Sequence, residues 1–283
     1  MTVTICPLAD DDLDAVLALL RPSEERSTFL VGNAIESGIS DRGGPRNGLW
    51  LGAFEGGRLA GVVAHARGPD SFLVAPGGHA RALLAEAERR GVRPRMILGT
   101  EDRVAEALAF LPASWRLARR NRETLMVLRW DRRVSAPPPR RAAEVIPLPP
   151  EHVGAVAAML DELARVGSLP HTPEENRGRA ARMAAQQSAV VALVDGKAVS
   201  MSVRAAATGR FVHVGATVTD PAFRRAGLAG ACVDLVLDRA RADGVASEGA
   251  VLFTGESNTP AIALYESLGF RPETRFDICV IEK

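Results

Sequence analysis

A junction between a predicted strand and a predicted helix carries the residue types best suited to chemistry. The run Val218-Thr219-Asp220-Pro221 closes an apolar strand, and Arg224-Arg225-Ala226-Gly227-Leu228-Ala229 follows where a helix begins. The first turn of a helix has unpaired N–H groups and a partial positive charge, which suits a phosphate. Gly227 admits a bulky anion close to the backbone, and Arg224 and Arg225 add charged donors. Taken alone, the segment fits an anion site and an ordinary turn with solvated arginines equally well.

A second segment follows about thirty residues later. Val251-Leu252-Phe253-Thr254 is a short apolar run typical of a strand, and Gly255-Glu256-Ser257-Asn258 follows it. A helix is predicted from Pro260, and Gly269 ends it at the C-cap position. This helix contains Tyr265, the one tyrosine of the chain.

Together the two segments resemble the GNAT superfamily of acyl-CoA-dependent N-acyltransferases. In that family the first loop grips the pyrophosphate of coenzyme A. The later pattern supplies an asparagine near the cofactor arm and a tyrosine near its sulfur. Both motifs occur here in the family's order and at a comparable separation. The matching positions are Arg224, Gly227, Ala229, Asn258, Tyr265, Gly269 and Phe270.

The resemblance implies that acetyl-CoA, or another acyl-CoA, is the acyl-donor substrate. It implies that the strand at 217–219 splays from its neighbour and pairs with the pantetheine arm, with the N–H of Val218 facing the thioester oxygen. Tyr265 would protonate the departing sulfur; its alternative role is that of a core aromatic residue. The implied donor-binding residues are Thr217, Val218, Thr219, Arg224, Arg225, Ala226, Gly227, Leu228, Ala229 and Asn258.

The base that takes the proton of the attacking amine stays open. His213 lies on the strand that leads to the junction, and an imidazole titrates in the useful range. Histidines on strands are more often structural, so His171, Glu256 and a chain of waters are equal alternatives. No metal site is predicted, because no group of ligands has the required spacing.

Composition limits the classes of protein that the chain can belong to. The 283 residues carry a formal net charge of +1, and 47% of them are hydrophobic. This length favours two domains, and the near-neutral charge argues against nucleic acid as a partner. We expect no membrane span and no signal peptide. The cysteines are odd in number and widely spaced, which indicates free thiols of a cytoplasmic protein; they are Cys6, Cys232 and Cys279.

Matched segments in the same order favour a duplication over chance similarity in an alanine-rich chain. A proline-rich linker is predicted at 134–143, and the pattern Ile5-Cys6-Pro7-Leu8 returns just after it as Val145-Ile146-Pro147-Leu148, at an offset of 140 (147 − 7). Further along, Met96-Ile97-Leu98 matches Val251-Leu252-Phe253 at an offset of 155 (251 − 96). At that offset Arg103 stands opposite Asn258 and Phe110 opposite Tyr265, and the first copy lacks the Arg-x-x-Gly-x-Ala motif.

We therefore predict an α+β protein of two tandem GNAT-like domains, each a mostly antiparallel twisted sheet flanked by helices. Residues 1–133 form a degenerate, non-catalytic copy, and residues 144–283 form the acetyltransferase domain. The expected activity is acetyl transfer to an amine of a small molecule or a peptide by a monomer or homodimer. The alternative is a non-catalytic sensor that binds coenzyme A or its thioesters.

Overall fold

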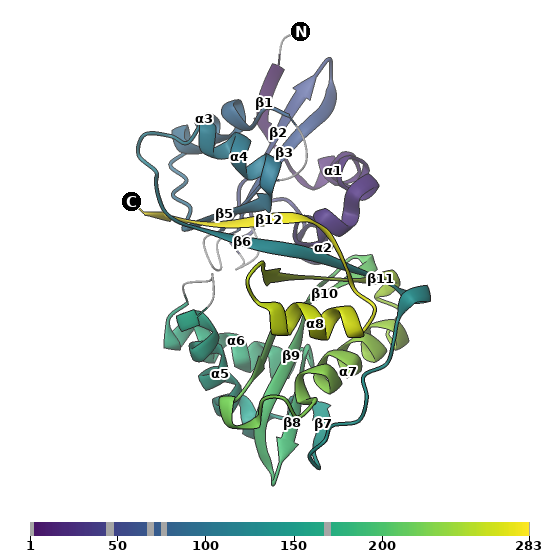
Figure 1. The fold of residues 1–283 in the computed structure, drawn as a ribbon. Helices are drawn as coiled ribbons and strands as arrows, with labels where there is room; N and C mark the ends of the chain where they lie inside the picture. The colour runs from purple at the N-terminus through teal and green to yellow at the C-terminus, as the bar shows by residue number, and fades with distance from the viewer. Residues whose placement is uncertain (1–2, 44–47, 67–70, 75–77, 167–170, 283) are drawn as a thin grey trace. The chain divides into compact units, whose positions relative to one another are not determined.

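The computed structural model describes residues 3–43, 48–66, 71–74, 78–166 and 171–282. Residues 1–125 and 273–283 form one compact unit, called unit 1 here, and residues 126–272 form another, called unit 2. Figure 1 traces the order of their elements along the chain.

Unit 1 is a sheet with helices on it. The strand order is β1-β2-β3-β4-β5-β12-β6, in which β4 and β5 are parallel neighbours. Helices α3 and α4 bury Leu83, Leu84 and Val104 against strands of this sheet. The elements are β1 (Val3–Pro7), α1 (Leu13–Leu20), α2 (Thr28–Ser37), β2 (Trp50–Glu55), β3 (Arg58–Ala66), β4 (Ser71–Val74), α3 (Ala80–Arg89), β5 (Met96–Thr100), α4 (Glu101–Ala109), β6 (Arg116–Arg129) and β12 (Arg271–Glu282).

Unit 2 repeats this order of elements. Its strands run β6-β11-β10-β9-β8-β7, and β10 and β11 are the parallel pair. The elements are β7 (Glu144–Pro147), α5 (Val153–Val166), α6 (Pro173–Ala185), β8 (Ala189–Val194), β9 (Lys197–Ala207), β10 (Gly209–Thr219), α7 (Leu228–Ala242), β11 (Ala246–Gly255) and α8 (Thr259–Ser267). The repetition confirms the predicted tandem arrangement and the mixed α/β class.

The compact units differ from the predicted sequence copies at their edges. Strand β12, which ends the second copy, pairs antiparallel with β5 of unit 1, for example Ile278 with Leu98. The last residues of β6, from Met126, belong to unit 2 instead. The sequence repeat identifies which copy a strand comes from. It does not fix the edge that the strand joins, because main-chain pairing is available to any strand of suitable pattern.

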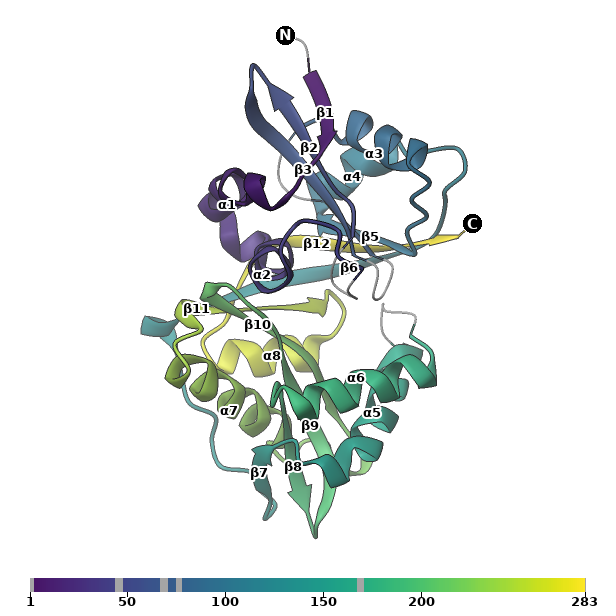
Figure 2. The same ribbon diagram turned by 180° about the vertical axis from the view of Figure 1, so that it is seen from behind.

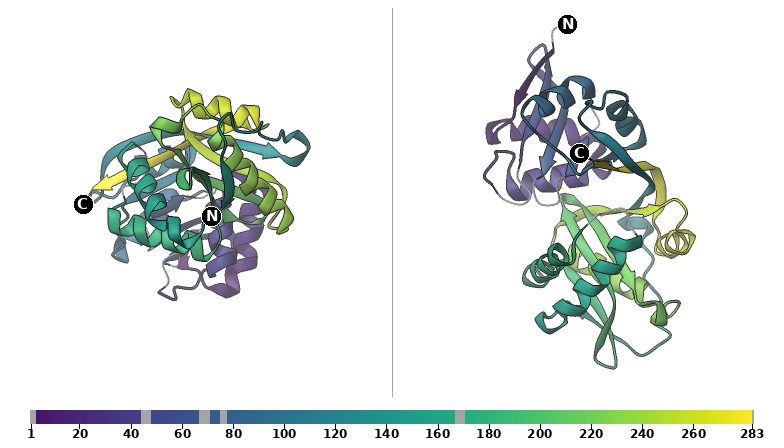
Figure 3. Two further views of the ribbon diagram at one scale, coloured as in Figure 1. Left: turned by 90° about the horizontal axis from the view of Figure 1, so that it is seen from below. Right: turned by 90° about the vertical axis from the view of Figure 1, so that its left-hand side faces the viewer.

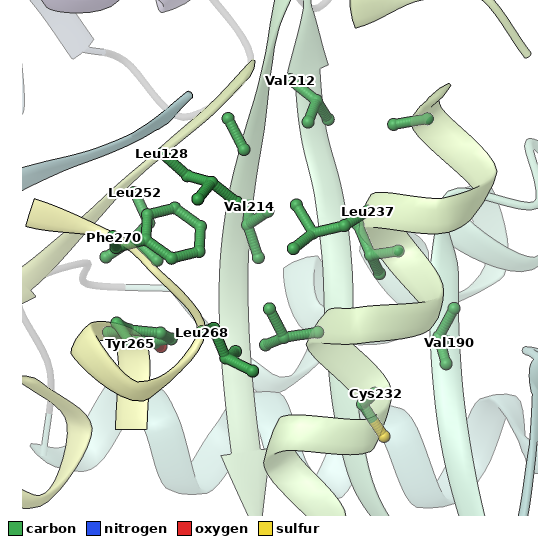
Figure 4. Packing of buried hydrophobic residues seen from close by; sticks show 14 of the residues in the cluster. Leu128, Val190, Val212, Val214, Cys232, Leu237, Leu252, Tyr265, Leu268 and Phe270 are labelled. Atoms are coloured by element: carbon green, nitrogen blue, oxygen red, sulfur yellow. The ribbon is translucent and has the colours of Figure 1, made fainter. Parts of the chain in front are cut away.

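Two apolar clusters cover the two faces of the sheet in unit 2. On one face α5 and α6 pack over Val191, Met201 and Val203. On the other face α7 and α8 pack over Val212, Val214 and Leu252. Figures 2 and 3 show the helix pairs on opposite sides of the strands, and Figure 4 shows the second cluster. Both faces are covered, so β8 is apolar throughout and residues 211–214 of β10 are all buried.

Candidate functional site

The parallel pair of unit 2 is hydrogen-bonded over only part of its length. Pairing between β10 and β11 ends at His213 opposite Val251, although β10 continues to Thr219 and β11 to Gly255. The carboxyl ends of the two strands therefore leave backbone groups facing each other without a mutual ladder. This is the splay that the resemblance predicted at 217–219, and an extended ligand with amide groups fits such an opening.

A β-bulge accompanies the splay. Gly215 pairs with Val203 of β9 but Val218 pairs with Met201, so β10 has one residue more than its partner. Ala216, inside the bulge, has φ +46°, which is rare for a residue with a side chain. A bulge bends and twists its strand locally. A second register shift of β10 against β9, between His213 and Val214, lies where the pairing with β11 ends.

Two buried serines of β9 hold the bulged strand, and the sequence interpretation missed them. The Ser202 hydroxyl lies 3.0 Å from Thr217 Oγ1. Ser200 donates to the carbonyl of Val218 at 3.0 Å and lies 2.7 Å from Thr219 Oγ1. The available signal was two hydroxyls at period two in an otherwise apolar strand, both fully buried. Buried hydroxyls need partners, and here the partners are the residues that we expect to line the donor site.

The predicted anion loop leads from the splayed end of β10 to helix α7. Gly227 is the N-cap, with φ +82°, and Leu228 is the first helical residue. Arg225 also has a positive φ, +65°, so two residues of this short loop have left-handed conformations. Arg224, Arg225 and Gly227 are exposed, while Leu228 is buried. The amino end of α7 is therefore an exposed, positively flanked set of amides. The half-buried Ala226 and Ala229 contribute the remaining backbone amides of this loop and first turn.

Neither Arg224 nor Arg225 forms an ion pair with a residue in the described parts of the chain. Arg224 Nε donates to the carbonyl of Thr219 at 3.3 Å, which keeps its side chain close to the end of β10. The loop itself is fixed by Asp220, whose carboxylate accepts from Ala222 N at 2.8 Å. The two guanidinium groups are therefore available to a phosphate.

The proline-rich segment 134–143 is an ordered part of unit 2. Arg140 N donates to the carbonyl of Ala226 at 2.9 Å, and the guanidinium of Arg141 lies 4.7 Å from the Phe223 ring centroid. An ideal Cβ on Gly227 would lie 3.4 Å from the Cα of Pro139. The segment therefore lies against Gly227, and the positive φ of Gly227 is the feature that favours glycine here.

Helix α8 carries the second motif. Asn258 is its exposed N-cap, and the side-chain oxygen accepts from Ala261 N at 3.4 Å, a contact that does not use the amide nitrogen. Tyr265 is 7% exposed and packs edge-on against Phe270, with ring centroids 5.9 Å apart. Figure 4 shows it beside Leu268 in the cluster beneath α7 and α8.

The two motifs meet at the first turn of α7. An ideal Cβ on Gly230 would lie 3.2 Å from Leu264 Cδ1, so α7 and α8 approach closely one residue before Tyr265. Small residues permit such close contact between helices. The helix that follows the loop and the helix that carries Tyr265 are therefore direct neighbours. The individual ligand contacts of the residues in both motifs stay predictions.

The base candidates differ in their surroundings. His213 is buried against Phe253, at 4.9 Å between ring centroids, and burial lowers its pKa to about 3. It is therefore neutral and shielded, which favours the structural role. His171 lies 3.8 Å from Glu175 across the first turn of α6. Glu256 is half-buried and directly follows the end of β11, at the opening of the splay.

The structure corrects the sequence match at the last helix. Thr100 is the N-cap of α4 and Asn258 that of α8, which gives an offset of 158 (258 − 100) and not 155. The buried Ala107 therefore corresponds to Tyr265 (265 − 158), and the matches of Arg103 and Phe110 were wrong. The reason is local: α4 begins directly after β5, whereas turn residues separate β11 from α8.

The described residues also bear on the presence of a reactive thiol, a metal site and a membrane-spanning helix. The three cysteines are free, and burial raises the pKa of Cys232 to about 12, so this thiol is not a nucleophile. The described residues contain no group of three or more histidine, cysteine or acidic side chains placed to hold a metal. None of the described helices is long and apolar enough to cross a membrane.

The fold and the site define a class of protein without reference to any relative. It is a mixed α/β protein in which the parallel strands β10 and β11 separate at the end that leads to the exposed amino end of α7. Residues 156–270 match the sequence profile of the Acetyltransferase (GNAT) family. This part of the chain is a GNAT domain, and the family and fold support an acyl-CoA-dependent acyltransferase in general. No curated protein matches the chain.

Solved structures extend the likeness to nearly the whole chain. A tandem GNAT protein from the clavulanic acid biosynthesis pathway is 18% identical, covers 98% of both chains and has a TM-score of 0.62. A Drosophila protein reaches a TM-score of 0.68 at 17% identity, over 98% of both chains. A GCN5-related N-acetyltransferase from Sphaerobacter thermophilus has a TM-score of 0.63 at 17% identity, over 98% of this chain and 94% of its own. At such identities the likeness shows the tandem fold.

Proposed function

We propose that the GNAT domain of this protein transfers an acetyl group from acetyl-CoA to an amine of a small molecule or a peptide. The observation that carries the proposal is the open pair β10 and β11, which leads directly to the exposed amino end of α7. In this proposal Thr217, Val218 and Thr219 contact the pantetheine arm. The amides of Arg225 to Ala229 and the two arginines take the diphosphate, and Asn258 faces the arm from α8.

Transfer proceeds by direct attack. The amine nitrogen attacks the thioester carbonyl carbon, the carbon–sulfur bond breaks, and the sulfur leaves with the bonding electron pair. A backbone donor such as the N–H of Val218 stabilises the charge that develops on the carbonyl oxygen, which in other acyl-transfer enzymes is worth about 3–4 kcal/mol. Fixed hydroxyl contacts from Ser200 and Ser202 keep this strand in place.

Two proton transfers complete the reaction. Tyr265 gives its phenolic proton to the leaving sulfur, and a base removes one from the amine. Among the base candidates Glu256 has the best position, since it borders the splay, and His213 the worst, since it is buried and neutral. A water chain serves equally well if the amine arrives neutral.

The first sequence copy, residues 1–133, is proposed to be non-catalytic. The residue that corresponds to Tyr265 is the buried Ala107, which has no proton to donate. The free thiols favour the cytoplasm as the compartment, and a monomer or homodimer suffices because the proposed site lies within unit 2.

The alternative function is a sensor that binds acyl-CoA without turnover, and one specific observation bears on it. Tyr265 belongs to the apolar cluster of α7 and α8. Acyl transfer uses this residue as a proton donor, whereas binding alone does not, so Tyr265 separates the two functions. The donor site itself is common to both functions.

Calorimetric titration of the full chain with acetyl-CoA and with coenzyme A tests the donor site. Release of free thiol in the presence of a panel of primary amines then tests transfer. We expect saturable heat with both nucleotides and thiol release that depends on the amine. Heat without release from any amine supports the sensor, and absence of heat removes both functions.

A further inference from the structure

Helix α6 carries three arginines, Arg177, Arg179 and Arg182, and only Arg179 among them is half-buried. Within the described part of the chain, the side chain of Arg179 makes one hydrogen bond, from Nη1 to Asn176 Oδ1 at 2.9 Å. Neither Arg179 nor Arg182 forms an ion pair with a residue that the structure describes. The adjoining residues 167–170, which lie outside the described part, contain no acidic residue. A half-buried guanidinium is normally paired with a carboxylate, since desolvation is costly.

The surroundings of Arg179 are organised. Asn176 is fully buried, and its amide nitrogen donates to Asp161 Oδ1 at 2.8 Å. Its oxygen is therefore the end that faces Arg179, and the guanidinium is held in one position. Only one of the five guanidinium N–H donors is used in this contact. The remaining donors of a fixed fork suit a carboxylate or a phosphate.

Arg182 adds a second positive charge beside the first. It stands one helical turn after Arg179, and its Nη1 lies 3.4 Å from the position of an ideal Cβ on Gly178, so its side chain folds back along the helix. Burial and then repulsion from Arg182 lower the pKa of Arg179, and Glu175 partly offsets them. Like charges three residues apart on a helix repel each other and destabilise it. An anion between them removes that cost.

The position of α6 relates this pair to the proposed acyl-transfer site. Ala180 and Met183, which flank Arg179 on the helix, belong to the apolar cluster that also contains Ala216 and Val218 of the bulge. The arginine pair therefore lies on a helix packed over the strand where the thioester would sit. Figure 2 shows α6 on this face of the sheet.

We propose that Arg179, assisted by Arg182, binds an anionic group of the acceptor, so that the preferred substrates are amines that also carry a carboxylate or a phosphate. The proposal rests on the acetyltransferase function above and names its substrate class. Arg179 supplies the fork, Asn176 and Asp161 hold it in place, and Arg182 strengthens the local positive field.

Matched pairs of amines test the proposal with the full chain. L-lysine and cadaverine differ by one carboxylate, and phosphoethanolamine and ethanolamine differ by one phosphate. We expect acetyl-CoA-dependent thiol release with a higher kcat/KM for the anionic member of at least one pair, and the responding pair identifies the anion. Arg179→Gln should lower that kcat/KM by about 10- to 100-fold, the range for a charge-assisted contact.

Two further variants separate a binding role from a structural one. Arg179→Lys keeps the charge and should retain part of the preference. Arg177→Gln removes an exposed charge from the same helix and should leave it intact. Equal kcat/KM for both members of each pair, or an equal loss in Arg179→Gln for both members, overturns the anion site. Both results leave acetyl-CoA binding standing, whereas a wild-type protein that binds no acetyl-CoA overturns the proposed function itself.

Discussion

The amino ends of α3 in unit 1 and α7 in unit 2 begin alike and are surrounded differently. Each N-cap has a left-handed backbone conformation: His79 with φ 72° and Gly227 with φ 82°. The ring of His79 lies 2.7 Å from a carboxylate oxygen of Glu55. The preceding Gly78 donates to the carbonyl of Ala60 and packs on β3, whereas residues 75–77 lie outside the described chain. At α7 the flanking side chains are arginines.

The parallel strand pairs beside these helix ends also differ between the two units, in how far along their length they stay paired. In unit 1 the parallel pair β4 and β5 stays in register to Leu73 opposite Leu98, next to the end of β4. The carbonyl oxygen of Val74 lies 2.7 Å from an ideal Cβ on Gly99, so the strands remain close there. In unit 2 pairing stops at His213 and the strands part. Among the described residues, the two units thus differ both in where the parallel strands separate and in the side chains beside the helix end.

Of the variants considered, Tyr265→Phe is expected to lower activity most. It removes the proposed proton donor from unit 2, and unit 1 has the non-acidic Ala107 at the corresponding position. Loss of the general acid should lower kcat for acetyl transfer by about 100- to 10,000-fold. Calorimetry should find the acetyl-CoA affinity unchanged, since the ring still packs on Phe270. Steady-state thiol release measures the loss, and an unchanged kcat would exclude the acid role.

Gly227→His copies the N-cap of α3 into α7. The new side chain meets Pro139, displaces segment 134–143 and shifts the amides of the loop. Misplacement of binding groups by about 1 Å can cost about 100-fold, and we expect an increase of that order in the acetyl-CoA Kd.

Backbone strain must be separated from this effect. Gly244 follows α7, has φ +68° and has open space around it, so Gly244→His imposes the same left-handed strain away from the loop. Such strain costs about 1–2 kcal/mol of stability. We expect both variants to melt earlier but only Gly227→His to lose affinity. Equal affinity in the two variants would contradict the loop assignment.

His213→Leu tests whether the stability of unit 2 falls at acid pH because His213 is buried. The folded-state pKa of His213, about 3, lies below the ordinary value of 6.5, so the unfolded chain binds the proton more strongly. The contribution to stability is complete above pH 6.5 and is lost as the pH falls toward 3. At pH 5 the loss is about 2 kcal/mol.

Hydrogen exchange followed by mass spectrometry can assign that loss to a unit. Peptides from β10 and β11 should lose protection between pH 6.5 and 5 before peptides from β2 and β3 do. In His213→Leu the protection of β10 and β11 should no longer depend on pH over this interval. Persistence of the same pH dependence in the variant would assign the acid sensitivity to other groups.

Sequence patterns predicted most of the second copy's elements. Thr172, Pro173 and two acidic residues predict the start of a helix at 172–187, and the structure has α6 there with a capping box between Thr172 and Glu175. The apolar run at 211–219 predicts a strand, and β10 covers it with two more residues at its beginning. These elements are signalled locally, by caps, proline and apolar periodicity, and neighbours in space do not alter them.

The parts that sequence patterns missed depend on partners distant in the chain. The bulge at Ala216 exists only relative to the register of β9, and the serines that hold it become meaningful only once that register is known. Segment 134–143 reads as a spacer, yet it packs on Gly227. Arg179 is indistinguishable in sequence from Arg177, and burial alone separates them.

The sequence by itself determined the tandem arrangement, the class of fold and the two motifs of the donor site, because each depends on short-range patterns that occur in order along the chain. Tertiary structure decided where the parallel strands separate, which unit β12 joins and which arginine becomes desolvated. These outcomes follow from strand register and burial, which are set by contacts between residues far apart in the chain.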